Sequence, residues 1–125
     1  MAKILIIEDE APFRSVLARV LQEKGHTVVE TPDGSDALRL CRLHGFDLML
    51  TDLIMPNKEG IETIIEVRKD FPVLPIIAMS GGGRSGPQDL LSAAAALGAH
   101  ATITKPFHIQ ELIALIEAQL AAAAK

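Results

Sequence analysis

Short apolar runs alternate with helical patterns along the whole of this chain. The runs are continuous rather than interrupted by polar residues, which is typical of strands that are covered on both faces. Five strands are therefore predicted, at residues 3–7, 27–30, 47–51, 75–79 and 100–104. Few of the hydrophobic residues are aromatic, so the core between these strands and their neighbours is expected to be aliphatic.

Five helices are predicted between and after the strands, where apolar residues recur at helical spacing. The first ends before Gly25 and the second near Gly45, since glycine commonly follows the last turn of a helix. The third follows Gly60, the fourth covers about 88–97 and the last about 108–122. In the third helix the predicted inward positions are Ile61, Ile64, Ile65 and Val67, and the predicted outward positions are Glu62, Glu66, Arg68 and Lys69.

Strands that alternate with helices predict an α/β fold. Such a chain forms a parallel sheet with helices on both faces, joined by right-handed crossovers. A length of 125 residues is that of one ordinary domain, and the alternation shows neither a repeat nor an internal linker. Residues 1–125 are therefore expected to form a single domain.

Polar side chains of particular kinds follow four of the apolar runs. Glu8 and Asp9 come after the first strand, Asp52 after the third, Ser80 after the fourth and Lys105 after the fifth. The carboxyl ends of parallel strands lie along one edge of the sheet, and ligands of open α/β sheets bind at that edge. We therefore expect these five groups to meet in one site.

The chemistry of these groups suits phosphoryl transfer. Glu8, Asp9 and Asp52 would repel one another, and a hard divalent cation such as Mg²⁺ would relieve that repulsion. Asp52 could then act as a nucleophile and form an acyl phosphate. Lys105 could bind a phosphoryl oxygen as a point charge, and Ser80 could donate its hydroxyl to the same group. The Lys105–Pro106 bond is a candidate for a cis peptide in a fixed turn.

Composition narrows the classes of function. The net charge of −4 gives no electrostatic case for binding nucleic acid. The single cysteine, Cys41, cannot form an internal disulfide, which suits a reducing cytosol. No secretory signal pattern opens the sequence, and no apolar stretch approaches the roughly 20 residues that a membrane helix needs. A soluble, cytoplasmic protein without membrane association is expected.

The ordered set of strand-end motifs resembles that of the CheY-like receiver domains of two-component response regulators. Each motif alone is weak, but the set is specific and its order and spacing cover essentially the whole chain. The matching segments are Glu8-Asp9, Asp52-Leu53-Ile54-Met55-Pro56 with Gly60, Ser80-Gly81 and Lys105-Pro106-Phe107.

The resemblance implies a fold and a reaction. The fold would be flavodoxin-like, a (βα)5 three-layer sandwich with the strand order 2-1-3-4-5. Asp52 would take a phosphoryl group from the phosphohistidine of a sensor histidine kinase or of a histidine phosphotransfer protein. Glu8, Asp9, Asp52 and the backbone carbonyl of Ile54 would hold Mg²⁺, for which Mn²⁺ can substitute. Such a domain catalyses its own phosphorylation and dephosphorylation and does not turn over an external substrate.

The resemblance also implies how the signal leaves the domain. Lys105 would pair with the phosphate, and Ser80 would move toward it as the switch hydroxyl. The family usually has an aromatic residue three positions before the lysine, and Thr102 stands there instead. A downstream protein or effector domain would bind the face formed by the fourth helix, fifth strand and fifth helix, with the domain a monomer or a phosphorylation-dependent dimer.

Three alternatives differ in how well the residues fit them. A phosphatase of the haloacid dehalogenase type would need a second acid where Ile54 stands. A flavin-binding module would need a first loop that cradles phosphate, which Glu8 and Asp9 would repel, and an aromatic partner that Tyr and Trp do not supply. A degenerate receiver that binds partners without phosphorylation stays open. The complete set of carboxylates and lysine disfavours it, and Thr102 favours it.

The resemblance predicts a long-lived phosphoryl group on Asp52. The two positions that tune self-hydrolysis in the family carry Ile54 and Gly82, and neither side chain can orient an attacking water. Because hydrolysis needs an oriented nucleophile, the phosphoryl group is expected to persist for on the order of hours. Intact mass, followed in Mg²⁺ buffer after the phosphodonor is removed, measures this lifetime, and loss within seconds would contradict the prediction.

Overall fold

A five-stranded sheet forms the centre of the computed structural model, which describes residues 2–53, 60–81, 94–95 and 97–123. The strands are β1 (Lys3–Ile7), β2 (Thr27–Thr31), β3 (Leu48–Asp52), β4 (Ile76–Gly81) and β5 (Ala101–Lys105). The helices are α1 (Ala11–Glu23), α2 (Ala37–His44), α3 (Gly60–Asp70) and α5 (Ile109–Ala123), and a 3-10 turn at Gly34–Asp36 precedes α2. The predicted fourth helix, about 88–97, lies mostly outside the described residues.

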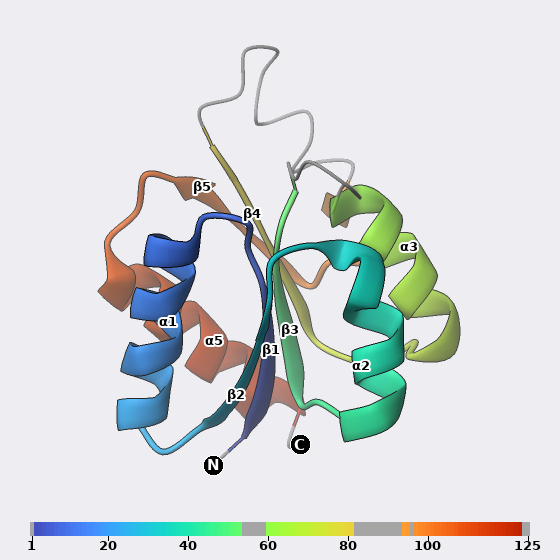
Figure 1. Ribbon diagram of the computed structural model, residues 1–125, viewed down its shortest axis with the longest axis horizontal. Coiled ribbons are helices and arrows are strands. Elements are labelled where there is room, and N and C mark those ends of the chain that lie inside the picture. The colour runs from blue at the N-terminus through green and yellow to red at the C-terminus, as the bar shows by residue number, and fades with distance from the viewer. Residues whose placement is uncertain (1, 54–59, 82–93, 96, 124–125) are drawn as a thin grey trace.

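The sheet is parallel throughout, in the order β2-β1-β3-β4-β5. Helices α1 and α5 lie on one face of it, and α2 and α3 lie on the other (Figure 1). The predicted flavodoxin-like, three-layer α/β fold is confirmed. Because all the strands run in one direction, their carboxyl ends share one edge of the sheet, as the candidate site requires.

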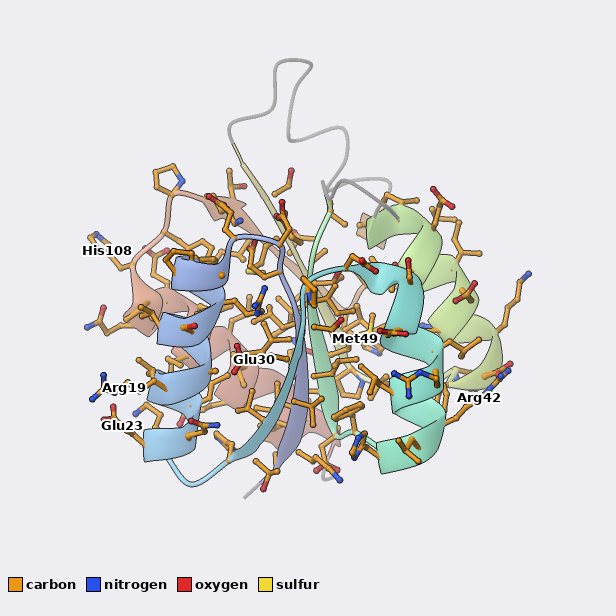
Figure 2. The ribbon with its side chains drawn as sticks, in the orientation of Figure 1. Arg19, Glu23, Glu30, Arg42, Met49 and His108 are labelled. Atoms are coloured by element: carbon orange, nitrogen blue, oxygen red, sulfur yellow. The ribbon has the colours of Figure 1, made fainter. Side chains whose placement is uncertain are left out.

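Side chains of each central strand alternate between two separate cores. In β1, Ile4 and Ile6 pack in the core beneath α1 and α5, while Leu5 and Ile7 pack in the core beneath α2 and α3. In β3, Met49 belongs to the second core, and Figure 2 shows it between the sheet and α2. Both faces are covered, which explains why the strands read as continuous apolar runs.

Four of the five strands extend one or two residues further than the apolar runs predict, and β1 ends where predicted. Asp52 and Lys105 are the last residues of β3 and β5, and Ser80 lies inside β4. Their backbones still pair with the neighbouring strand, since Asp52 lies opposite Met79 and Gly81 lies opposite Lys105. A polar side chain does not end a strand while its backbone groups still pair with a neighbour, so the site residues stand on the rigid sheet.

Helix α3 differs from the predicted division into inward and outward positions. Ile65, predicted to face the core, is 37% exposed, whereas Thr63 is fully buried. Arg68, predicted to point outward, is partly buried and donates hydrogen bonds to the carbonyls of Phe71 and Gly98. The buried stripe of the helix is Gly60, Thr63, Ile64 and Val67.

The neighbouring isoleucines of α3 offer a matched test of this correction. Ile64 is fully buried, so Ile64→Ala is expected to lower the free energy of unfolding by about 2–5 kcal/mol. Ile65→Ala removes the same atoms from an exposed position and is expected to cost less than about 1 kcal/mol. Urea unfolding followed by circular dichroism measures both values, and equal losses would show that the helix is rotated from the described orientation.

Candidate functional site

Three charged groups reach the same face of the sheet because strand side chains alternate with a period of two. Glu8, Asp52 and Lys105 each stand two positions after a residue that packs in the core beneath α1 and α5. Those three residues are Ile6, Leu50 and Ile103. The N–H of Glu8 donates to the carbonyl of Thr31 at 3.1 Å, so the backbone keeps its pairing beyond the end of β1. The alternation therefore delivers two carboxylates and an ammonium to one side of the carboxyl edge.

The carboxylates form one cluster. Glu8, Asp9 and Asp52 each offer an oxygen, and these oxygens all lie within 4.8 Å of one another. Glu8 is fully buried and Asp52 is 6% exposed, whereas Asp9 is exposed at the rim. The sequence-based expectation that these three acids meet is confirmed.

Lys105 is the cation of this cluster. Its Nζ lies 2.8 Å from Glu8 Oε1 and 3.4 Å from Asp52 Oδ2, and it lies 3.8 Å from Oε1 of the exposed Glu10. The peptide bond that follows it, Lys105–Pro106, is cis as predicted. The ammonium therefore points into the acidic pocket and stands beside the aspartate that the sequence singles out as the acceptor.

The electrostatics show that one ammonium does not balance this pocket. Burial raises the pKa of Glu8 to about 7, a rise that the hydrogen bond from Lys105 opposes and the charge of Asp52 reinforces. Burial alone would lower the pKa of Lys105, but the hydrogen bond to Glu8 and the charges of Asp52 and Glu8 outweigh it, so that pKa is raised. Three carboxylates therefore face one ammonium in this pocket, and burial disfavours the charged form of Glu8.

The donor set fits a hard divalent cation. All three groups of the cluster supply carboxylate oxygens, which Mg²⁺ prefers, and the excess negative charge favours an added cation. Glu8 is also held in place, because its Oε2 accepts from the N–H of Glu10 at 3.1 Å and its carbonyl accepts from Arg14 Nη1 at 2.6 Å. Ile54, expected to add a backbone carbonyl, lies outside the described residues.

Ser80 carries a hydroxyl that nothing in the described part of the chain satisfies. The side chain is fully buried, and its Oγ has no hydrogen-bond partner among the described residues. A buried hydroxyl without a partner is costly, so it is a donor available to an incoming oxygen. Thr102 lies opposite Ala78, one step along the same face as Ser80, and is half-buried. Gly82 lies outside the described residues.

Gly60 allows the first turn of α3 to approach the acceptor strand closely. A Cβ at this position would overlap the carbonyl oxygen of Asp52 and lie 2.7 Å from Cα of Leu53. The N–H of Gly60 also donates to the carbonyl of Leu53 at 3.0 Å. The family resemblance includes Gly60 but does not explain why glycine stands there. The contact with the end of β3 explains it.

Comparison with known proteins adds to this geometry. Residues 4–117 match the family model of the response regulator receiver domain. The chain belongs to this family. It is 38% identical over 116 residues to the transcriptional regulatory protein PdtaR of Mycobacterium tuberculosis, a match that covers 92% of this chain and 55% of PdtaR. This chain therefore spans about half the length of the curated relatives it matches.

Solved structures of receiver proteins have the same fold. A putative response regulator from Chloroflexus aurantiacus superposes with a TM-score of 0.86 at 26% identity, covering 96% of this chain and 98% of that one. The chemotaxis protein CheY4 of Vibrio cholerae gives 0.83 at 28% identity, with 94% and 97% covered. NtrX of Brucella abortus gives 0.89 at 28% identity, with 98% of this chain and 28% of NtrX covered.

Membership of the family settles the general role of the domain. It is a receiver domain of two-component signalling and not a turnover enzyme, and receiver domains have a histidine kinase as partner. The cluster of Glu8, Asp9 and Asp52 is consistent with a phosphorylation site and typical of the magnesium site of receivers. Within the described part of the chain, no helix has the length and apolarity needed to cross a membrane.

Substituting Gly60 tests its contact with the acceptor strand. Gly60→Ala is expected to cost about 1–3 kcal/mol of stability, since the added Cβ meets backbone rather than a movable side chain. It is also expected to shift the amide resonances of Asp52 and Leu53. Gly45→Ala is the control, because Gly45 has a φ of +68° but open space around its Cβ position, at the opposite edge of the sheet. Unchanged Asp52 and Leu53 resonances in Gly60→Ala would contradict the prediction.

Proposed function

We propose that this domain accepts a phosphoryl group on Asp52 from the phosphohistidine of a histidine kinase or histidine phosphotransfer protein, in a Mg²⁺-dependent reaction. The observation that carries the proposal is the approach of the Lys105 ammonium to 3.4 Å from Asp52 Oδ2, within the cluster of carboxylates. An acceptor, a cation for the phosphoryl oxygens and acidic donors for a metal are thereby brought together. The same assembly argues that residues 1–125 work as one unit, because it draws on β1, β3 and β5.

The reaction transfers the phosphoryl group from nitrogen to oxygen. A carboxylate oxygen of Asp52 attacks phosphorus, the P–N bond to the imidazole breaks, and its electron pair stays on the ring nitrogen, which takes up a proton. Lys105 donates to a phosphoryl oxygen and gives up its hydrogen bond to Glu8 in doing so. Glu8 and Asp9, with Asp52 and the carbonyl of Ile54, are the proposed metal ligands. Bound there, Mg²⁺ or Mn²⁺ would shield the phosphoryl group from the negative charge of the pocket.

The proposed conformational switch uses the Ser80 hydroxyl, which has no hydrogen-bond partner among the described residues. Ser80 would turn its Oγ toward the phosphoryl group, and Thr102 would take the place of the usual aromatic partner on the same face. A downstream protein or effector domain would bind the face made by the fourth helix, β5 and α5, with the domain monomeric or dimerising on phosphorylation. Direct binding of nucleic acid by this domain is not proposed, because its net charge is −4.

A second function is favoured by one observation. Thr102 lacks the ring that rotates in the family, so the domain could bind its partner without phosphorylation. One variant distinguishes the two functions. Asp52→Asn would abolish phosphorylation-dependent signalling, whereas it would leave phosphorylation-independent partner binding unchanged. The convergence of Lys105 with the three carboxylates supports the first.

Incubation with a small phosphodonor and Mg²⁺, read by intact mass, tests the proposed function. The wild-type protein is expected to gain one phosphoryl group, and Asp52→Asn or added EDTA to prevent the gain. Asp47→Asn is the matched control, because Asp47 is an exposed aspartate just before the same strand, and its Oδ2 accepts from the N–H of Lys3. Labelling of Asp52→Asn to the same extent as the wild type would place the acceptor elsewhere.

A further inference from the structure

An aromatic ring contacts the site lysine, and a second ring lies against the first. The Lys105 Nζ lies 4.8 Å from the centroid of the Phe13 ring, over its face. Phe107 follows the Lys105–Pro106 bond, and its ring centroid lies 5.9 Å from that of Phe13 with the planes tilted by 60°. Phe13 belongs to the first turn of α1, so an element that contributes no charged group to the carboxylate cluster contacts its cation.

The Phe13 ring is held in place from two sides. Arg14, its neighbour in α1, bonds through Nη1 to the carbonyl of Glu8 and through Nε to Glu30 at 3.3 Å. The half-buried ring also packs against the core beneath α1 and α5, where Phe107 packs as well. The start of α1 is thus tied to the end of β1, and this tie holds the ring beside Lys105.

The Phe13 ring contacts the Lys105 ammonium in a different way from its carboxylate partners among the described residues. The face of an aromatic ring attracts a cation through its quadrupole, but it accepts no conventional hydrogen bond and does not titrate. Lys105 has three N–H donors, and its close polar contacts are carboxylate oxygens of Glu8 and Asp52. Those contacts must change when a phosphoryl group and a metal enter the pocket, whereas the ring contact can persist in both states.

We propose that Phe13 is a positioning residue for phosphoryl transfer. The face of its ring holds the Lys105 ammonium at the pocket while the hydrogen bond of that ammonium passes from Glu8 to a phosphoryl oxygen. The inference rests on the proposed function. Without the ring, the ammonium of the long lysine side chain is free to follow the rearranging carboxylates. With it, the cation keeps one fixed partner throughout the exchange.

The first experiment needs neither metal nor phosphate. A ring beneath the ammonium shields the terminal methylene protons of Lys105, so their NMR resonances are expected upfield of ordinary lysine positions. Phe13→Leu should remove this shift and Phe13→Tyr should keep it. Phe46→Leu should leave it unchanged, since the Phe46 ring lies against His44 instead. Ordinary lysine shifts in the wild-type protein would overturn the proposal.

The second experiment measures phosphorylation rate against phosphodonor concentration at saturating Mg²⁺. Phe13→Leu is expected to lower the maximal rate about three- to tenfold, with Phe13→Tyr within about twofold of the wild type. Trifluorophenylalanine at position 13 keeps the size of the ring and weakens its quadrupole. The protein that carries it should have the lowered maximal rate of Phe13→Leu and the urea stability of the wild type. This variant separates the cation contact from packing.

Two outcomes of the rate measurements would also overturn the role of Phe13. One is an unchanged maximal rate in Phe13→Leu. The other is a rate for the trifluorophenylalanine protein equal to that of the wild type, which would reduce Phe13 to a packing residue. Failure of the wild-type protein to take up phosphate would contradict the proposed function instead, and the shifted Lys105 resonances would still report the ring contact.

Discussion

The burial of carboxylates at the carboxyl edge of the sheet, compensated by Lys105, is the constraint on which the rest of this structure depends. Glu8 is fully buried and Asp52 nearly so, and two such charges without a cation would oppose folding. The ammonium comes from a residue 97 positions from Glu8 and 53 from Asp52 in the chain. The ion pairs therefore link β5 to β1 and β3, and the domain must be assembled before they can form.

Neighbouring elements hold the charged groups of the site in fixed positions. Alternation along the strands places the charged groups on one face, and Arg14 fixes the carbonyl of Glu8 from α1. On the other face, Gly60 lets α3 meet the end of β3 where any Cβ would collide with backbone. A pocket that holds three carboxylates in a fixed frame suits a divalent cation, because the cation would relieve their repulsion and shield an incoming phosphoryl group from their charge.

The groups that would receive the phosphoryl group are in contact with one another, whereas the groups that would pass on the signal are not all present. The carboxylates and Lys105 are in contact in this structure, whereas Ser80 has no hydrogen-bond partner in the described residues and Thr102 supplies no ring. An aromatic contact is nonetheless present at the site, where Phe13 lies beneath the ammonium. The chain thus places an aromatic ring beside the cation that would bind the phosphate, although the family's usual aromatic position before the lysine carries Thr102.

The α/β class and the candidate site can be predicted from the sequence, because continuous apolar runs and the residues that end them are local patterns. The order of the strands came from the family resemblance, and the parallel sheet of the structure agrees with that order. Three features came from the packed structure: Ile65 is exposed, Gly60 meets β3, and Phe13 contacts Lys105. Periodicity cannot fix these features, since each depends on how a helix is rotated and how closely it approaches the sheet.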